Sequence, residues 1–209
     1  MDLSTITTAA CDFRWLAPEV ILTVGGLVVL LLGVFIRGGG ATASCVLTLT
    51  TSVVALYFSK GLWGQNIDLF NGLYVIDGFG TFFKVVILVI LALVTLISRR
   101  YMEREGQPAG EYYSLMIFAA LGMMCMVSSK HFITIFIGLE VMSLAIYVLC
   151  GLFRASIRSV EASLKYFLLG AFATAFLLYG MALIYATTGL LDIVGIGAFV
   201  RAGGFQASP

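Results

Sequence analysis

The stretch FIGLEVMSLAIYVLCG, residues 136–151, decides how the rest of the chain is interpreted. Fifteen of its sixteen residues are uncharged, and the exception, Glu140, is a carboxylic acid near the middle. A helix of about 20 apolar residues is long enough to cross the roughly 30 Å hydrocarbon core of a bilayer. The stretch therefore predicts a membrane-spanning helix that carries one ionisable group at depth.

The composition of the whole chain agrees with a membrane environment. Hydrophobic residues make up 61% of the sequence and charged residues 11%, whereas an ordinary soluble domain is about 25% charged. The net charge of +1 leaves no basic surface to neutralise phosphates, and no glycine-rich phosphate loop follows a strand pattern. The chain is therefore predicted to be an integral membrane protein that binds neither nucleic acid nor nucleotide.

Six apolar windows are long enough to span a bilayer, and each must be helical because lipid offers no partner to an unpaired backbone amide. No alternating ten-residue segments of the kind found in β-barrels are present. The predicted fold is all-α, a polytopic bundle of about six transmembrane helices in a single membrane domain over residues 1–209. The predicted spans are residues 17–36, 41–59, 78–98, 112–129, 131–151 and 162–189.

The charges between the spans predict an orientation. The first fifteen residues lack the basic start of a signal peptide, so the first span is expected to be retained. Six bases follow spans one, three and five, and four lie on the opposite side, which places the N-terminus outside and the odd connections in the cytoplasm. The six are Arg37, Arg99, Arg100, Arg104, Arg154 and Arg158, and the four are Arg14, Lys60, Lys130 and Arg201.

Two connections are long enough to hold structure. The segment KGLWGQNIDLFNGLYVID, residues 60–77, alternates apolar and polar residues, which is typical of a short hairpin on the outer face but also of a solvated connector. Trp63 and Tyr74 are expected to anchor it at the membrane interface. The segment RRYMEREGQPAGE, residues 99–111, is expected to be a solvated turn.

Glu140 is the strongest candidate for a functional residue. It is the tenth residue of its predicted span, about 14 Å from the nearer end, too deep for its short side chain to reach water. An ionisable group at the centre of a span costs about 2.5–3.5 kcal/mol, and such groups usually face a bundle interior or a water path. The alternative is a static carboxylic acid that joins helices, with Ser143 one turn away as its partner.

Two lysines lie inside predicted spans. Lys165 stands near the start of the sixth span, and the short connection before it predicts that spans five and six are antiparallel neighbours. Glu140 and Lys165 are therefore expected to form a proton relay, because a change in their pairing shifts the pKa values of both groups. Lys84, a secondary candidate in the third span, either extends its side chain to the interface or takes part in the relay.

The remaining chemistry-bearing residues give weaker signals. His131, the only histidine, lies between spans four and five and is either a proton-exchanging group at the interface or a plain turn residue. No catalytic triad, haem ligand pair or metal-binding set is evident in the spans. The cysteines are expected to behave as small apolar residues: Cys11, Cys45, Cys125 and Cys150.

The motifs EVMSLAIYVL, an arginine-bearing loop, and EASLKYFLLGAF, together with the early stretch LAPEVILTVGGLVVLLLGVF, resemble the subunit N family of bacterial NADH-quinone oxidoreductase, respiratory complex I. The resemblance runs along the whole chain. It implies an antiporter-like fold with inverted repeats. In that family the glutamate of the fifth span, here Glu140, belongs to the proton pathway, and the lysine of the LKYF stretch, here Lys165, is its polar neighbour.

The same resemblance implies about fourteen spans and a pumping lysine on a broken seventh helix, so this chain is expected to be the N-terminal part only, ending before the seventh span. Its tail from Asp192 is too short and glycine-rich to span a bilayer. NADH oxidation and quinone reduction, with flavin and iron-sulfur clusters, are expected in other subunits, and no cofactor or metal in this chain.

The function expected from the resemblance is proton translocation in the membrane arm of complex I, with neighbouring antiporter-like subunits as partners. The expected location is the bacterial inner membrane. Two alternatives stay open: a stand-alone cation/proton antiporter subunit, and a structural spacer that pumps nothing.

Overall fold

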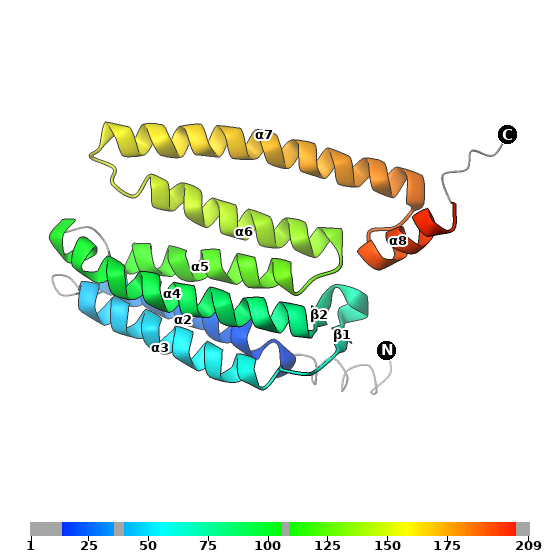
Figure 1. Cartoon of the computed structure of the whole chain (residues 1–209). Helices are drawn as coiled ribbons and strands as arrows, with labels where there is room; N and C mark the ends of the chain where they lie inside the picture. The colour runs from blue at the N-terminus through cyan, green and yellow to red at the C-terminus, as the bar shows by residue number, and fades with distance from the viewer. Residues whose placement is uncertain (1–13, 36–39, 106–108, 204–209) are drawn as a thin grey trace.

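The computed structural model describes residues 14–35, 40–105 and 109–203, which form long helices lying side by side (Figure 1). Six of them are long and apolar enough to cross a membrane, so the predicted all-α membrane bundle is confirmed. They are α2 (Ala17–Phe35), α3 (Gly40–Lys60), α4 (Gly78–Glu105), α5 (Ala109–Val127), α6 (Phe132–Cys150) and α7 (Ile157–Thr188). Cys11 and Arg37 lie outside the described residues.

Two helices extend beyond the spans expected from hydropathy. α4 continues through Arg99 to Glu105, so most of the expected turn over residues 99–111 is helical. Arginine and glutamate are good helix formers, and Arg99 pairs with Glu103 one turn away, with 3.0 Å between Nε and Oε1. α7 begins at Ile157 because the Ser156 side chain accepts a hydrogen bond from the Ser159 amide and caps the helix.

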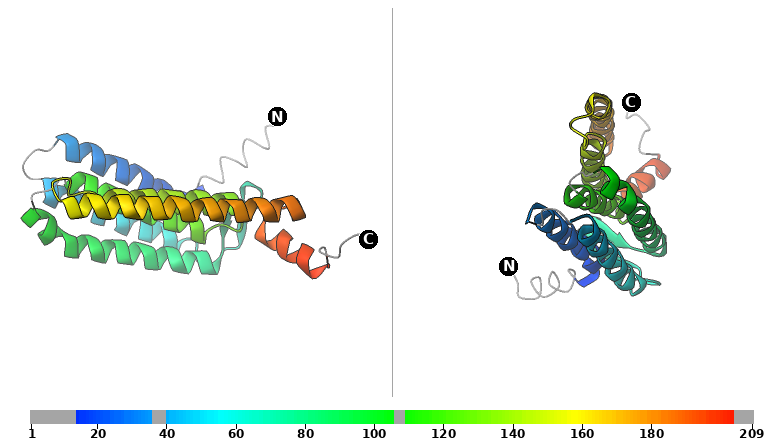
Figure 2. Two further views of the ribbon diagram at one scale, coloured as in Figure 1. Left: turned by 90° about the horizontal axis from the view of Figure 1, so that it is seen from above. Right: turned by 90° about the vertical axis from the view of Figure 1, so that its left-hand side faces the viewer.

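The helices differ in how much of their surface the chain covers. α5 packs against α2, α3, α4 and α6, and half of its spanning window is buried. α7 packs mainly on α6, and only 6% of its window is buried. Viewed end-on, α6 and α7 project from the group formed by α2 to α5 (Figure 2). α6 therefore lies between the compact group and a helix whose surface is largely open.

Glycines set the closest helix crossings. A Cβ atom added to Gly122 of α5 would lie 2.5 Å from the carbonyl oxygen of Gly138 and 2.6 Å from the Met142 amide nitrogen, both on α6. Small residues allow this approach, which is how helices gain contact area in lipid. The α5–α6 contact therefore depends on the absence of a side chain at residue 122.

The connection between α3 and α4 forms a hairpin at one end of the bundle. β1 (Ile67–Leu69) pairs antiparallel with β2 (Tyr74–Ile76), and a 3₁₀ turn over Phe70–Gly72 joins them. Gly72 has a φ of +86°, a conformation that glycine adopts without strain. The hairpin interpretation is confirmed and the solvated connector is wrong. All three side chains of β2 are buried, so Tyr74 is not an interface anchor.

Backbone hydrogen bonds tie three connections together at the hairpin end. Val75 of β2 donates to the Ser128 carbonyl at 2.7 Å. In the same turn between α5 and α6, the Lys130 carbonyl accepts from Ile193 at 2.8 Å. Ile193 begins α8 (Ile193–Arg201), a helix of nine residues that is too short to span, as expected for the tail. The hairpin, this turn and α8 therefore share one end of the bundle (Figure 1).

Candidate functional site

Glu140 lies near the centre of an apolar helix. It is the ninth of the nineteen residues of α6, which places it about 12 Å from the first residue of the helix at a rise of 1.5 Å per residue. Its carboxyl oxygen Oε1 is buried and has no hydrogen-bond partner among the described residues. A carboxyl oxygen that is removed from water without a donor is energetically costly. The static alternative, in which Ser143 satisfies Glu140, does not account for this oxygen.

The structure separates Lys165 from Glu140. α6 and α7 are neighbours as expected, with the rings of Tyr147 and Tyr166 4.9 Å apart. Lys165 therefore lies level with Tyr147, about 10 Å along α6 from Glu140. Its side chain is 70% exposed and pairs with Glu161 on its own helix. Among the described residues no ion pair joins Glu140 to Lys165, so the expected contact between them is not formed.

His131 has a local structural role. Its Nδ1 accepts a hydrogen bond from the Ile133 amide at 3.3 Å and so caps the start of α6. Its backbone also forms an isolated β-bridge with Asp192, the cap of α8. These contacts favour the turn interpretation over proton exchange.

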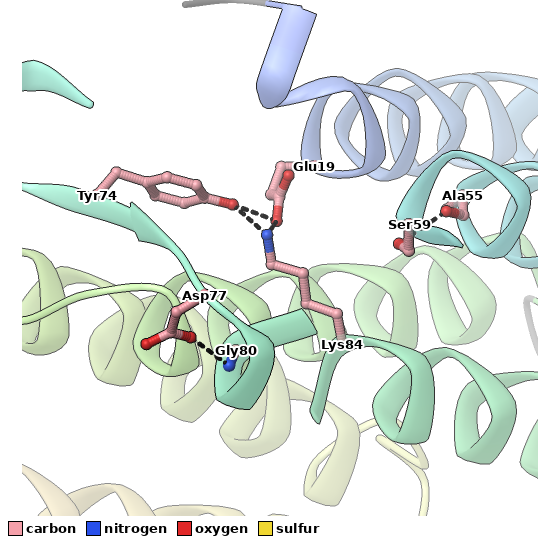
Figure 3. Close-up of polar contacts among 7 residues, drawn as sticks. All are labelled: Glu19, Ala55, Ser59, Tyr74, Asp77, Gly80 and Lys84. Atoms are coloured by element: carbon pink, nitrogen blue, oxygen red, sulfur yellow. Dashed lines mark hydrogen bonds and ion pairs between the residues drawn. The ribbon is translucent and has the colours of Figure 1, made fainter. Parts of the chain in front are cut away.

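Lys84 is buried and does not extend to the interface. Its side chain is 1% exposed, and Nζ lies 2.9 Å from Oε1 of Glu19, which is itself 7% exposed. Nζ also donates to the Tyr74 hydroxyl at 2.7 Å. The Tyr74 hydroxyl in turn donates to Oε1 of Glu19 at 2.5 Å. The three side chains, from α4, α2 and β2, thus form a closed triangle, which we call the buried ion-pair cluster (Figure 3).

Local structure places each member of this cluster. Glu19 is in the first turn of α2, where a carboxylate is favoured by the positive end of the helix dipole. Asp77 starts α4 by accepting a hydrogen bond from the Gly80 amide at 2.6 Å, which is a helix cap and fixes the direction of Lys84 (Figure 3). Tyr74 faces inward because Leu69, its partner across the hairpin, is also buried.

Burial sets the state of the tyrosine. Burial of the Tyr74 hydroxyl, reinforced by the negative charge of Glu19 beside it, raises the pKa of Tyr74 well above its ordinary value near 10. The nearby side chain of Ser128 makes a smaller contribution that lowers the pKa of Tyr74. Tyr74 therefore stays protonated at neutral pH and remains a donor to Glu19.

Glu19 lies in the apolar window of residues 17–36, which predicts a span and gives no role to this acid. One signal was available: Lys84 is a base inside an apolar window, and a buried base requires an acid. Glu19 is the acid in a neighbouring window. The hairpin between α3 and α4, which carries Tyr74 to this cluster, does not follow from the spacing of residues in the sequence.

The described residues contain no group of three histidine, cysteine, aspartate or glutamate side chains that could hold a metal ion. Cys45 is buried, and Cys125 and Cys150 are partly buried free thiols. Glu140 and the buried ion-pair cluster place acidic and basic side chains inside the bundle.

The chain is similar to a family of respiratory membrane proteins. Residues 129–207 match the family described as NADH:quinone oxidoreductase/Mrp antiporter, TM. NADH-quinone oxidoreductase subunit N of Trichlorobacter lovleyi is 45% identical over 183 residues, which is 88% of this chain and 38% of that protein. Subunit N of Paramagnetospirillum magneticum is 42% identical over 187 residues, 90% of this chain and 38% of that protein.

Two solved structures contain chains with a similar fold. Respiratory complex I from Thermus thermophilus with bound aureothin contains a chain that matches with a TM-score of 0.70 and 33% identity, covering 84% of this chain and 38% of that one. A chain of the archaeal membrane-bound sulfane sulfur reductase has the same fold, with a TM-score of 0.77 and 20% identity, covering 91% of this chain and 40% of that one.

The present chain thus spans about two fifths of the length of the relatives it matches. By sequence and by fold, it is similar to the NADH-quinone oxidoreductase subunit N family of antiporter-like membrane proteins.

Proposed function

We propose that this chain is a proton-translocating part of the membrane arm of an NADH-quinone oxidoreductase. The observation that carries the proposal is Glu140, a carboxylic acid at the centre of α6 with a buried oxygen that lacks a hydrogen-bond partner. Such an oxygen can take up a proton at depth. NADH oxidation and quinone reduction are proposed to take place in other subunits, which would hold the flavin and iron-sulfur clusters.

Lys165 is proposed as the second group of the relay. It does not contact Glu140, but its ion pair with Glu161 is largely exposed on α7. Exposed pairs contribute only about 0–1 kcal/mol, so Lys165 can exchange Glu161 for another partner at little cost. A change of charge or hydration next to α7, driven by quinone chemistry elsewhere, would then alter the protonation of Glu140.

The location follows from the charges at the two ends of the bundle. The end of α4 and the connection between α6 and α7 lie at the end of the bundle opposite the hairpin (Figure 1), and they carry Arg99 and Arg154. Lys60 ends α3 just before the hairpin, and Lys130 lies in the turn between α5 and α6 at the hairpin end. Because cytoplasmic connections carry the excess of bases, we place the hairpin and the start of α2 outside, in the bacterial inner membrane. The open surface of α7 is proposed to face lipid and other membrane-arm helices.

The test is Glu140→Gln in the intact enzyme, which keeps the size of the side chain and removes its proton exchange. We expect the rate of NADH-driven proton pumping in membrane vesicles to fall at least about tenfold, equivalent to about 1.4 kcal/mol of barrier. Assembly is checked on native gels.

Glu105→Gln at the exposed end of α4 is the matched control and should pump normally. Normal pumping by a fully assembled Glu140→Gln enzyme would make Glu140 a structural residue and end the proposal. The family description also covers Mrp antiporters, so a chain that never co-purifies with quinone reductase activity belongs to the stand-alone antiporter class instead.

A further inference from the structure

The buried ion-pair cluster stands apart from the proposed relay in α6 and α7. Glu19 belongs to α2, Lys84 to α4 and Tyr74 to the hairpin, so it shares no helix with Glu140 or Lys165. The side chains of Glu19 and Lys84 are both more than nine-tenths buried. Two opposite charges held this deeply require an explanation, because a well-packed apolar pair would stabilise the same position as well or better.

The two oxygens of Glu19 are in different situations. Oε1 forms an ion pair with Lys84 and accepts a hydrogen bond from Tyr74. Oε2 is buried and has no hydrogen-bond partner among the residues that the structure describes. An ionised carboxylate has about four acceptor sites, and here they are satisfied on one side only. Oε2 is therefore an acceptor without a donor, although Lys84 and Tyr74 both lie beside the other oxygen of the same carboxylate.

Four titratable groups lie near Glu19 and Lys84. Tyr74 holds its proton, because burial raises its pKa. Cys125 of α5 is a partly buried free thiol close enough to influence Tyr74. Asp77 and Lys130 lie farther out, with 4.0 Å between their charged atoms, and both are partly exposed. Glu19 is the member of the cluster with an unpartnered acceptor oxygen, because Lys84 and Tyr74 act as donors.

A cavity lies beside the hairpin strand β2. It has a volume of about 190 Å³, and apolar side chains line it together with Asp77, Ser128, Ser129 and Lys130. This volume is sufficient for water, and these four residues offer polar partners. The Ser128 hydroxyl is buried without a hydrogen-bond partner in the described part of the chain. The Ser128 carbonyl accepts a hydrogen bond from Val75, the residue after Tyr74, at 2.7 Å. Ser128 therefore contacts both the cavity and the strand that carries Tyr74.

We propose that Glu19, Lys84 and Tyr74 form a second proton-binding site, which exchanges protons with the aqueous phase at the hairpin end through Ser128 and this cavity. In the loading step a hydronium ion gives its proton to Oε2 of Glu19 and leaves as water. Lys84 and Tyr74 keep their protons, so the charge of the cluster changes from zero to plus one. Release is the reverse step. The use of this site in pumping rests on the proposed function, but its protonation does not.

The experiment is a pH titration of the intact enzyme in membranes by infrared difference spectroscopy, following the C=O stretch of protonated carboxylic acids. We expect a pH-dependent band that disappears in Glu19→Gln and persists in Glu140→Gln. Glu105→Gln serves as the matched control and should keep the band. The same band in wild type and Glu19→Gln would show that the ion pair is static, which overturns the proposal.

Lys84→Gln gives a second readout that does not depend on Glu19→Gln assembling. Removing the ammonium group takes away the charge that favours ionised Glu19, so the midpoint of the band should move about one to three units to higher pH. An unchanged midpoint overturns the assignment. If Glu140→Gln pumps normally while the Glu19 band titrates, the proposed relay fails and the second site stands.

Discussion

Lys84→Met lowers the free energy of unfolding of this chain by about 3–5 kcal/mol, the expected result of leaving one charge of a buried pair without its partner. Methionine matches the length of lysine, so the packing around α4 changes little. Glu19 loses the ammonium group 2.9 Å away and retains only the Tyr74 hydroxyl as a donor. The measurement is reversible unfolding of the full chain in detergent micelles, followed by circular dichroism.

Two further variants make this prediction specific. Glu19→Gln combined with Lys84→Met removes both charges, so most of the lost stability should return and the double-mutant cycle should show strong coupling. Lys165→Met is the matched control, because the Lys165–Glu161 pair is exposed and its loss should cost less than about 1 kcal/mol. Equal losses for Lys84→Met and Lys165→Met would contradict the buried pairing.

Gly122→Ala is expected to lower the free energy of unfolding by about 1–3 kcal/mol, the cost of inserting a methyl group into a closely packed contact. The new Cβ would meet backbone atoms of α6, the Gly138 carbonyl and the Met142 amide. Backbone cannot rotate away as a flexible side chain can, so α6 must move as a whole. Because Glu140 lies two residues from Gly138, proton pumping should fall together with stability.

The control for this substitution is Gly180→Ala in α7, where an added Cβ meets no atom within 4 Å. Alanine has a higher helix propensity than glycine, by up to about 1 kcal/mol, so Gly180→Ala should be neutral or stabilising. Both variants are compared in the same unfolding assay. A Gly122→Ala chain as stable as the wild type would mean that α5 and α6 do not approach as closely as the structure places them.

The sequence predicts the positions of the helices better than it predicts which side chains on different helices contact one another. A span is dictated by the thickness of the bilayer and by the cost of an unpaired amide, so the six apolar windows predict the six helices. Hydropathy predicts the end of α4 too early, because a helix can continue beyond the membrane into water. Depth alone also identified Glu140 as an unusual residue.

Pairing required information that one sequence does not contain. The short connection between α6 and α7 correctly predicts that they are neighbours, but it does not fix their register, and Lys165 lies level with Tyr147 instead of Glu140. The contact between Glu19 and Lys84 is non-local and depends on the hairpin closing over α2. Lys84 is expected from the sequence either to extend to the interface or to take part in the relay, and its actual partner is a carboxylate from another helix.

The distance along the chain between Glu19 and Lys84 has a consequence for biosynthesis. At a translation rate of about 5–20 residues per second, α2 is made several seconds before α4. During that interval Glu19 lacks its cation, and as the third residue of α2 it can wait at the membrane surface, where a charge costs little. The ion pair between Glu19 and Lys84 therefore forms only after α4 has been made, so the final position of the start of α2 depends on a segment that is synthesised later.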